Sequence, residues 1–138
     1  MGASGKFWAH EHWNLESPPD MVTFAKKMNA AGFYYDESLK MDQAYRHFNT
    51  WLGDPVRILM CQKQNEIIKK YNLVEQTAET GKYFCSRLQE VSKEYPDWVN
   101  NVRGMGTFLA YDVGEKTDVK RNQLLARFKS FGVNAGGC

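Results

Sequence analysis

The 138-residue sequence predicts an α/β fold, on the evidence of its strand-like runs and its helical periodicity. Two short apolar runs, residues 21–24 and 32–35, have the length of strands and are separated by lysines and small residues. Three longer stretches, 55–71, 75–94 and 118–131, carry apolar residues at helical spacing. Strands and helices that follow one another in this way are typical of α/β domains.

The N-terminal part is expected to be irregular around its two strands. Residues 6–12 alternate loosely and predict an extended segment that ends at Trp13. Ser17-Pro18-Pro19 marks the loop that follows, because prolines interrupt regular structure. Met21–Phe24 is then expected to be a short buried strand and Gly32–Tyr35 a second one. The segment between these strands contains the lysines and is predicted to be a turn.

A helix is expected to begin at Asp54. The Asp54 carboxylate can accept hydrogen bonds from the free N–H groups of the first turn, and Pro55 suits the first helical position. The helix is predicted to run to about Tyr71. Its apolar positions include Ile58, Leu59, Ile67 and Ile68.

The remaining chain predicts two helices and two strands. One helix spans roughly Glu75–Glu94, and Val102–Gly106 is expected to be a turn that leads into a strand at Thr107–Val113. The other helix spans Asp118–Phe131, and Val133-Asn134-Ala135 predicts the start of a last strand. This order suits a small α/β domain that a long helix joins to the preceding sheet.

Composition excludes several classes of protein. With 43% hydrophobic and 25% charged residues, the chain can build a core. A net charge of +2 is too small to indicate binding to nucleic acid or to an anionic membrane. No run approaches the roughly 18 apolar residues that a membrane-spanning helix needs, and no signal or transit peptide starts the chain.

The sequence has three cysteines, Cys61, Cys85 and Cys138, which is an odd number, and none of them forms a C-x-x-C motif. Free thiols are therefore expected, and Cys61 and Cys85 are expected to be buried.

Lys26 is the strongest candidate for chemistry. It follows an apolar run that ends on Ala25, and the small residues Ala30, Ala31 and Gly32 come shortly after it. Apolar neighbours lower the pKa of a lysine amine, and a deprotonated amine can attack an aldehyde. Small neighbours leave room for a flat cofactor ring. The residues alone also allow a structural role, in which the lysine stem lies along a strand end and the amine stays in water.

The surroundings of Lys26 resemble the lysine signature of the class III aminotransferases, which act on ω-amino acids. The positions that fill the signature are Asp20, Met21, Val22, Ala25, Lys26, Ala30 and Ala31. Flanking stretches at 5–13, 48–55 and 102–108 resemble the 4-aminobutyrate aminotransferases of animals and fungi. The resemblance runs from Gly5 to Cys138, which is nearly the whole chain.

This resemblance implies a site that binds pyridoxal 5′-phosphate. Lys26, rather than its neighbour Lys27, would form the Schiff base with the cofactor and act as the catalytic residue. Thr50 would donate a hydrogen bond to the phosphate of the cofactor in the partner subunit of a homodimer. The alternative for Thr50 is a hydrogen bond to its own backbone that closes the loop before Asp54. Phe48 would line the substrate pocket.

Other motifs carry weaker signals. His10 and His12 would share one face of an extended segment, but two histidines are too few ligands for zinc, and no metal site is expected. Hydrogen-bonded surface histidines are the preferred interpretation. His47 is a weak pocket candidate because it is close to Thr50 in sequence. Arg103-Gly104-Met105-Gly106 contains a single G-x-G, which is weak evidence for a phosphate loop.

For the fold, the resemblance implies part of a fold-type-I transferase that depends on pyridoxal phosphate. Residues 1–53 would end the large domain and carry the cofactor lysine, whereas 54–138 would form a connecting helix and part of the small C-terminal domain. The chain is expected to be a fragment. It would lack the upstream aspartate that meets the ring nitrogen and the downstream arginine that binds the substrate carboxylate.

The implied reaction transfers the amino group of 4-aminobutyrate to 2-oxoglutarate and yields succinate semialdehyde and glutamate. Relatives of this kind are homodimers of the mitochondrial matrix, and the resemblance implies the same here. Two alternatives remain open. In the first alternative to this reaction, the chain is an inactive truncated remnant. In the second, it is part of an aminotransferase for another ω-amino acid.

Overall fold

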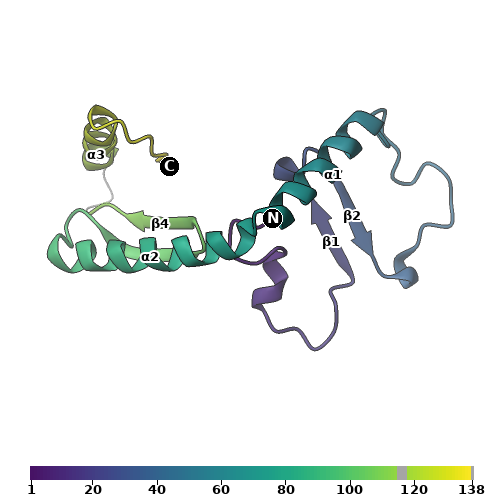
Figure 1. Cartoon of the computed structure of the whole chain (residues 1–138), viewed down its shortest axis with the longest axis horizontal. Helices are drawn as coiled ribbons and strands as arrows, with labels where there is room; N and C mark the ends of the chain where they lie inside the picture. Colours follow the sequence, from purple (N-terminus) through teal and green to yellow (C-terminus); the bar gives the residue numbers. More distant parts are fainter. Residues whose placement is uncertain (115–117, 138) are drawn as a thin grey trace. The chain divides into compact units, whose positions relative to one another are not determined.

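The computed structural model describes residues 1–114 and 118–137, and the chain forms two compact units (Figure 1). The first unit comprises Met1–Ala78, and the second begins at Glu79. Helix α2 (Leu73–Glu94) contributes residues to both.

An antiparallel hairpin forms the centre of the first unit. Strand β1 (Met21–Phe24) pairs with β2 (Gly32–Tyr35), with Met21 opposite Tyr35 and Phe24 opposite Gly32. Both strands were predicted within these bounds. A Cβ at Gly32 would lie 2.7 Å from the Phe24 ring, so a larger residue there would displace that ring. The expectation that β1 is buried was wrong, since its residues alternate between exposed and half-buried and Met21 is 49% exposed.

The segment before the hairpin is a short 3₁₀ helix, η1 (Ala9–His12), and not the extended segment that was predicted. The reason is local hydrogen bonding. Glu11 Oε1 accepts from the Trp8 backbone N–H at 2.6 Å, and the Glu11 N–H donates back to the Trp8 carbonyl at 3.2 Å. These reciprocal bonds close a turn that the loose polar alternation of the sequence concealed.

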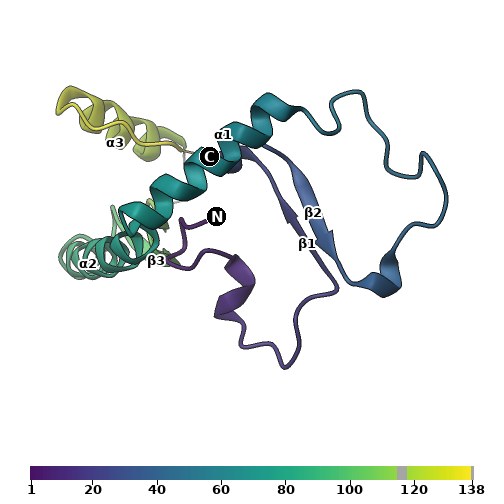
Figure 2. The same cartoon turned by 45° about the vertical axis from the view of Figure 1, so that its right-hand side comes forward.

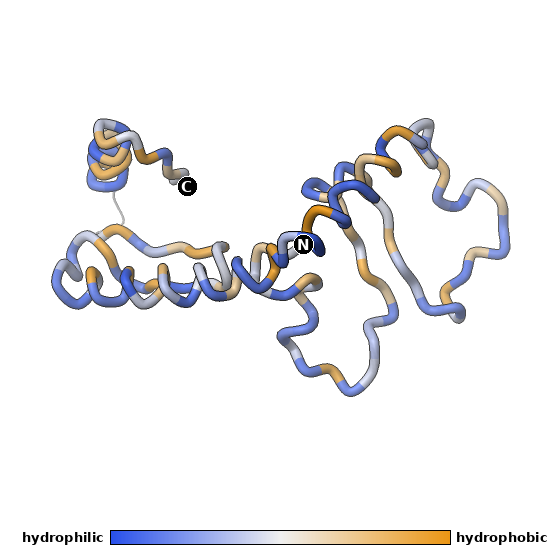
Figure 3. Tube along the Cα trace, viewed as in Figure 1, coloured by the Kyte–Doolittle hydropathy of each residue, from blue (hydrophilic) through white to orange (hydrophobic). Residues whose placement is uncertain are grey.

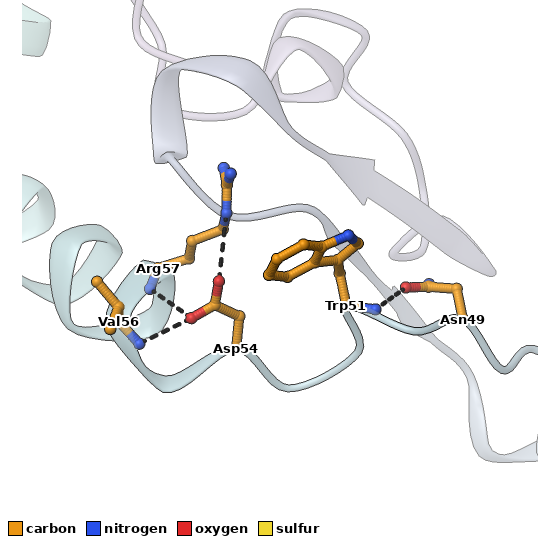
Figure 4. A network of polar contacts seen from close by, with 5 residues as sticks. All are labelled: Asn49, Trp51, Asp54, Val56 and Arg57. Atoms are coloured by element: carbon orange, nitrogen blue, oxygen red, sulfur yellow. Dashed lines mark hydrogen bonds and ion pairs between the residues drawn. The ribbon is translucent and has the colours of Figure 1, made fainter.

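Helix α1 (Pro55–Lys70) begins where it was predicted (Figure 4). Asp54 Oδ1 accepts from the backbone N–H groups of Val56 at 3.0 Å and of Arg57 at 3.4 Å. The other carboxylate oxygen forms an ion pair with Arg57 Nε at 3.4 Å. Such a cap stabilises a helix by about 1 kcal/mol. The Asp54-Pro55 pair therefore fixes where α1 begins.

The inward face of α1 differs from the expected one. Of its predicted apolar positions only Ile68 is buried, whereas Ile58 and Leu59 are 53% and 65% exposed. The residues that turn toward the rest of the unit share one helical stripe. They are Cys61, Gln64, Asn65 and Ile68.

In the second unit, α2 lies along a second antiparallel hairpin (Figure 1), and both are seen end-on in Figure 2. Its strands are β3 (Asn100–Met105) and β4 (Phe108–Asp112). A Cβ at Gly81 of α2 would lie 2.2 Å from the Gly106 carbonyl group, so the helix and the hairpin turn approach at backbone distance. Glycine at position 81 makes this contact possible.

The turn predicted at Val102–Gly106 was wrong, because most of those residues belong to β3. Gly104 has a φ of +123° and pairs with Leu109, and a Cβ there would lie 2.2 Å from the Phe108 carbonyl oxygen. It is therefore a strand glycine that permits close pairing and not a turn glycine. The turn is confined to Gly106 and Thr107.

Helix α3 (Asp118–Ser130) confirms the last predicted helix. Gly132 ends it with a φ of +76°, and the Val133 N–H donates to the Phe128 carbonyl at 2.9 Å. The strand predicted at Val133-Asn134-Ala135 was wrong. Residues 133–137 are irregular, and among the described residues no strand pairs with them.

Little of the apolar surface is covered within this chain. Only Met28, Ile68 and Val99 are buried among its described apolar residues. Apolar and polar residues are interspersed along the trace (Figure 3). In the described ranges no helix is long and apolar enough to cross a membrane.

Candidate active site

Lys26 lies at the start of a one-turn 3₁₀ helix, η2 (Lys26–Met28), between β1 and β2. Its φ of +53° is in the left-handed region, which residues other than glycine rarely adopt. Asn29 closes the turn with a φ of +58°, and its backbone N–H donates to the Lys26 carbonyl at 2.9 Å. Lys26 therefore has left-handed backbone, whereas Lys27 does not.

The Lys26 side chain is exposed, as is that of Lys27. The desolvation expected from a buried strand is thus not supplied by the described residues. No carboxylate of the described chain forms an ion pair with either lysine. The Lys26 amine is consequently available to a ligand.

Contacts with α1 hold the lysine turn in place. Met28 is 4% exposed and is the most buried apolar residue of the described chain. The Asn29 side-chain amide donates to Gln64 Oε1 on α1 at 2.5 Å. One residue further along the same stripe, Asn65 Oδ1 is buried and has no hydrogen-bond partner among the described atoms. Sequence reasoning missed Asn29 and Gln64, although the ability of asparagine to adopt left-handed backbone was an available signal.

Aromatic rings cover one face of the β1–β2 hairpin. The Phe24 and Tyr34 rings lie 5.5 Å apart, and Trp8 packs edge-on against both, at 6.4 Å and 5.8 Å between centroids. These contacts fix the N-terminal segment on the hairpin. None of these ring contacts involves a residue of the lysine turn.

The opposite face of the hairpin contacts the segment that leads to Thr50. Phe33 packs against Tyr35 at 5.6 Å and edge-on against His47, also at 5.6 Å between centroids. His47 thus has a packing role in the structure. The contact anchors the loop that contains Phe48 and Thr50 to the strand that follows the lysine turn.

Thr50 lies in a turn that its neighbour closes (Figure 4). Asn49 Oδ1 accepts from the Trp51 backbone N–H at 3.0 Å, and the Asn49 carbonyl accepts from the Leu52 N–H at 3.1 Å. The structural role considered for Thr50 therefore belongs to Asn49. The Thr50 hydroxyl is exposed and has no partner among the described residues.

Phe48 is 63% exposed and packs edge-on against Tyr45 at 5.6 Å. No hydrogen bond or ring contact joins Phe48 or Thr50 to the lysine turn within the described ranges. The chain thus presents two separate candidate elements, the lysine turn and the Thr50 turn.

A hollow of about 720 Å³ lies beside the hairpin, but it does not include Lys26. Trp8, Asp20, Tyr34 and Asp36 are among the residues that line it. Hydrogen bonds from the Ser38 hydroxyl and backbone N–H lower the pKa of Asp36. Because the hollow is open and distinct from the lysine turn, we do not assign the cofactor to it.

The premise of the metal hypothesis was wrong, because His10 and His12 lie on a 3₁₀ helix and not on one face of a strand. The His12 ring nitrogen Nε2 contacts the Ser4 hydroxyl at 3.1 Å, and the His10 ring stacks against Trp8. Across the described residues, no group of three or more His, Cys, Asp or Glu side chains could hold a metal ion.

Cys61 and Cys85 are free thiols on α1 and α2. Each is half-buried, so the expectation of full burial was wrong. Cys138, the third cysteine of the sequence, lies outside the described residues.

Curated relatives match the whole chain. The 4-aminobutyrate aminotransferase of Dictyostelium discoideum is 49% identical over 138 residues, which is 100% of this chain and 28% of that protein. The enzyme of the same name from Emericella nidulans is 49% identical and covers 99% of this chain and 27% of its own length. The human 4-aminobutyrate aminotransferase, described as mitochondrial, is 42% identical with the same coverage. The chain thus spans little more than a quarter of the length of these relatives.

Solved structures share the fold. A lysine aminotransferase from M. tuberculosis superposes with a TM-score of 0.82 at 23% identity, over 99% of this chain and 32% of that one. A Bacillus anthracis aminotransferase gives a TM-score of 0.81 at 23% identity, over 98% of this chain and 34% of that one. The α/β fold of type I, which the sequence resemblance implied, is confirmed. The family described as Aminotransferase class-III matches residues 1–138, and the chain belongs to that family.

Proposed function

We propose that the protein bearing these residues transfers the amino group of 4-aminobutyrate to 2-oxoglutarate, with succinate semialdehyde and glutamate as products. The observation that carries this proposal is the 42–49% identity to 4-aminobutyrate aminotransferases along at least 99% of the chain. Because the chain spans only 28% of the first of these relatives, the activity is proposed for a full-length protein.

The residues of the lysine turn fit pyridoxal 5′-phosphate as the cofactor. An aldehyde cofactor requires an amine that is accessible and free of ion pairs, and Lys26 meets both requirements within the described chain. Lys26 also differs from Lys27 in its left-handed backbone. When bound, the cofactor would supply a ring that accepts the electron pair of the bond broken at the amino-bearing carbon.

Lys26 would hold the cofactor covalently and then act as a proton carrier. Once the incoming substrate amine displaces it, the free Lys26 amine would remove the proton from the amino-bearing carbon of the substrate and return it to C4′, the aldehyde carbon of the cofactor. A single positioned base of this kind contributes about 10²- to 10⁴-fold to a rate. The exposure of Lys26 implies that parts of the full-length protein beyond these residues exclude water from it.

Thr50 would bind the cofactor phosphate from the neighbouring subunit of a homodimer, and Phe48 would line the pocket beside it. The free Thr50 hydroxyl supports this role, because Asn49 already closes the turn. In this proposal residues 1–53 end the large domain, and 54–138 form the connecting helix and part of the small domain. A mitochondrial location is supported by the animal relatives that are named mitochondrial.

Replacing each lysine of the pair separately tests the proposal in a full-length enzyme that carries this segment. Lys26→Arg keeps the charge but removes the primary amine, so transamination should fall by at least about 10³-fold, since both attachment and proton transfer are lost. Lys27→Arg is the matched control and should retain activity within about threefold. Equal losses in both variants, or an active Lys26→Arg enzyme, would contradict the proposal.

A further inference from the structure

The lysine turn is held in a backbone conformation that it would not keep by itself. Lys26 and Asn29, three residues apart, both have left-handed backbone, with φ of +53° and +58°. Asparagine adopts this conformation readily, but lysine does not, so the backbone of Lys26 is disfavoured relative to an ordinary turn. Such a conformation persists only where the surrounding contacts determine it.

Two hydrogen bonds determine the conformation of this turn, one to α1 and one within the turn itself. The Asn29 side-chain amide donates to Gln64 Oε1 at 2.5 Å, across 35 positions of sequence. The Asn29 backbone N–H donates to the Lys26 carbonyl at 2.9 Å. Gln64 is therefore linked through Asn29 to the backbone carbonyl of Lys26. Met28, in the middle of the turn, is buried, so the turn also packs within the first unit.

We infer that Gln64 is a positioning residue for Lys26, acting through Asn29. The inference rests on the proposed function, because it takes Lys26 as the cofactor lysine. With the amide pair intact, the turn has one conformation in which Lys26, and not Lys27, is presented to the cofactor. Without it, the turn relaxes toward ordinary backbone angles and the preference between the two adjacent lysines weakens.

The test compares three variants of Gln64 and Asn29 with a control on the same helix. Gln64→Leu removes the acceptor, Gln64→Glu keeps an acceptor oxygen, and Asn29→Gly removes the amide while it permits the left-handed backbone. Gln62→Leu is the control, because Gln62 is an exposed residue of the same type two positions earlier on α1. The proteins are full-length enzymes that carry this segment, loaded with pyridoxal phosphate.

The first readout is independent of turnover. Borohydride fixes the pyridoxyl group on the lysine that holds it, and peptide mapping gives the ratio of label on Lys27 to label on Lys26. Loss of one neutral hydrogen bond should raise this ratio about 3- to 10-fold in Gln64→Leu and in Asn29→Gly. The ratio should stay at the parental value in Gln64→Glu and in Gln62→Leu. Combining Gln64→Leu with Asn29→Gly should add nothing further, because both remove the same bond.

The second readout separates positioning from a general loss of stability. In Gln64→Leu, kcat should fall about 3- to 10-fold, with KM for 4-aminobutyrate within about twofold because Lys26 moves the proton but does not bind the substrate carboxylate. A parental labelling ratio in Gln64→Leu, with Lys26 labelled in every variant, overturns the inference and leaves the proposed function intact. A parent enzyme that carries no label on Lys26 overturns the proposed function itself.

Discussion

Two lysines stand side by side at the end of β1, and their backbone conformations differ. Lys26 has left-handed backbone and begins the 3₁₀ turn, whereas Lys27 lies inside it. The sequence pattern alone favoured Lys26 because a small residue precedes it. The structure adds an independent reason, since strained backbone at an accessible amine is a feature that clusters at functional sites.

A prediction for a single residue concerns Thr50. Thr50→Ala should weaken cofactor retention in a full-length enzyme by about 1–3 kcal/mol, because a buried phosphate oxygen would lose a donor. The measurement is the dissociation constant of pyridoxal phosphate. Thr107→Ala removes an exposed turn hydroxyl in the second unit and should leave that constant unchanged. If Thr50→Ala also leaves it unchanged, the phosphate role is wrong.

At the scale of elements, the sequence predicted features that depend on neighbouring residues, but it did not predict features that depend on tertiary contacts. Asp54-Pro55 and Gly132 mark helix ends through their own hydrogen bonds, so both boundaries were predictable. The inward face of α1 was not, because the sequence cannot say which apolar residues meet this segment and which meet chain outside it. The sequence could not indicate the Asn29–Gln64 contact either, because the two residues are far apart along the chain.

Gly104 shows why the hairpin of the second unit was misjudged. A glycine followed by a second one at Gly106 is typical of a turn, yet Gly104 serves close strand pairing. Its conformation depends on Phe108 across the hairpin. Only the fold decides between the two interpretations.

A prediction at this scale concerns Gly81 of α2. Alanine is favoured over glycine in a helix by about 1 kcal/mol, but the added Cβ would lie 2.2 Å from the Gly106 carbonyl group. The clash should dominate, so Gly81→Ala should destabilise the second unit by about 1–3 kcal/mol. Denaturant unfolding of a full-length enzyme measures this. Gly136→Ala adds the same methyl group where no atom lies within 4 Å and should be neutral; equal stability of both variants would refute the close approach.

For the whole molecule, the main feature is apolar surface that the chain does not cover. Residues as large as Trp51 and Phe108 are 76% and 79% exposed. Both hairpins are two-stranded, so each strand has a free edge within the described chain. A segment that matches little more than a quarter of its relatives would leave such surfaces for the remainder of a full-length protein to cover.

The 138 residues expressed alone are therefore expected to show no measurable transamination and to self-associate. Lys26 alone provides neither a phosphate cradle nor a grip on the substrate carboxylate, and positioning can account for about 7–11 kcal/mol of a barrier. Free strand edges and apolar faces favour aggregation. The measurement is glutamate formation from 4-aminobutyrate and 2-oxoglutarate with added cofactor, together with size-exclusion chromatography. Sustained turnover by a monodisperse 138-residue protein would contradict this expectation.

The central claim is that Lys26 is the residue that holds the cofactor. The most direct measurement is borohydride reduction of a full-length enzyme loaded with pyridoxal phosphate, followed by peptide mapping of the segment between β1 and β2. The account predicts one pyridoxyl group per subunit, located on Lys26, and its absence when sodium borohydride is omitted. A pyridoxyl group on Lys27, or none on this segment, would contradict it.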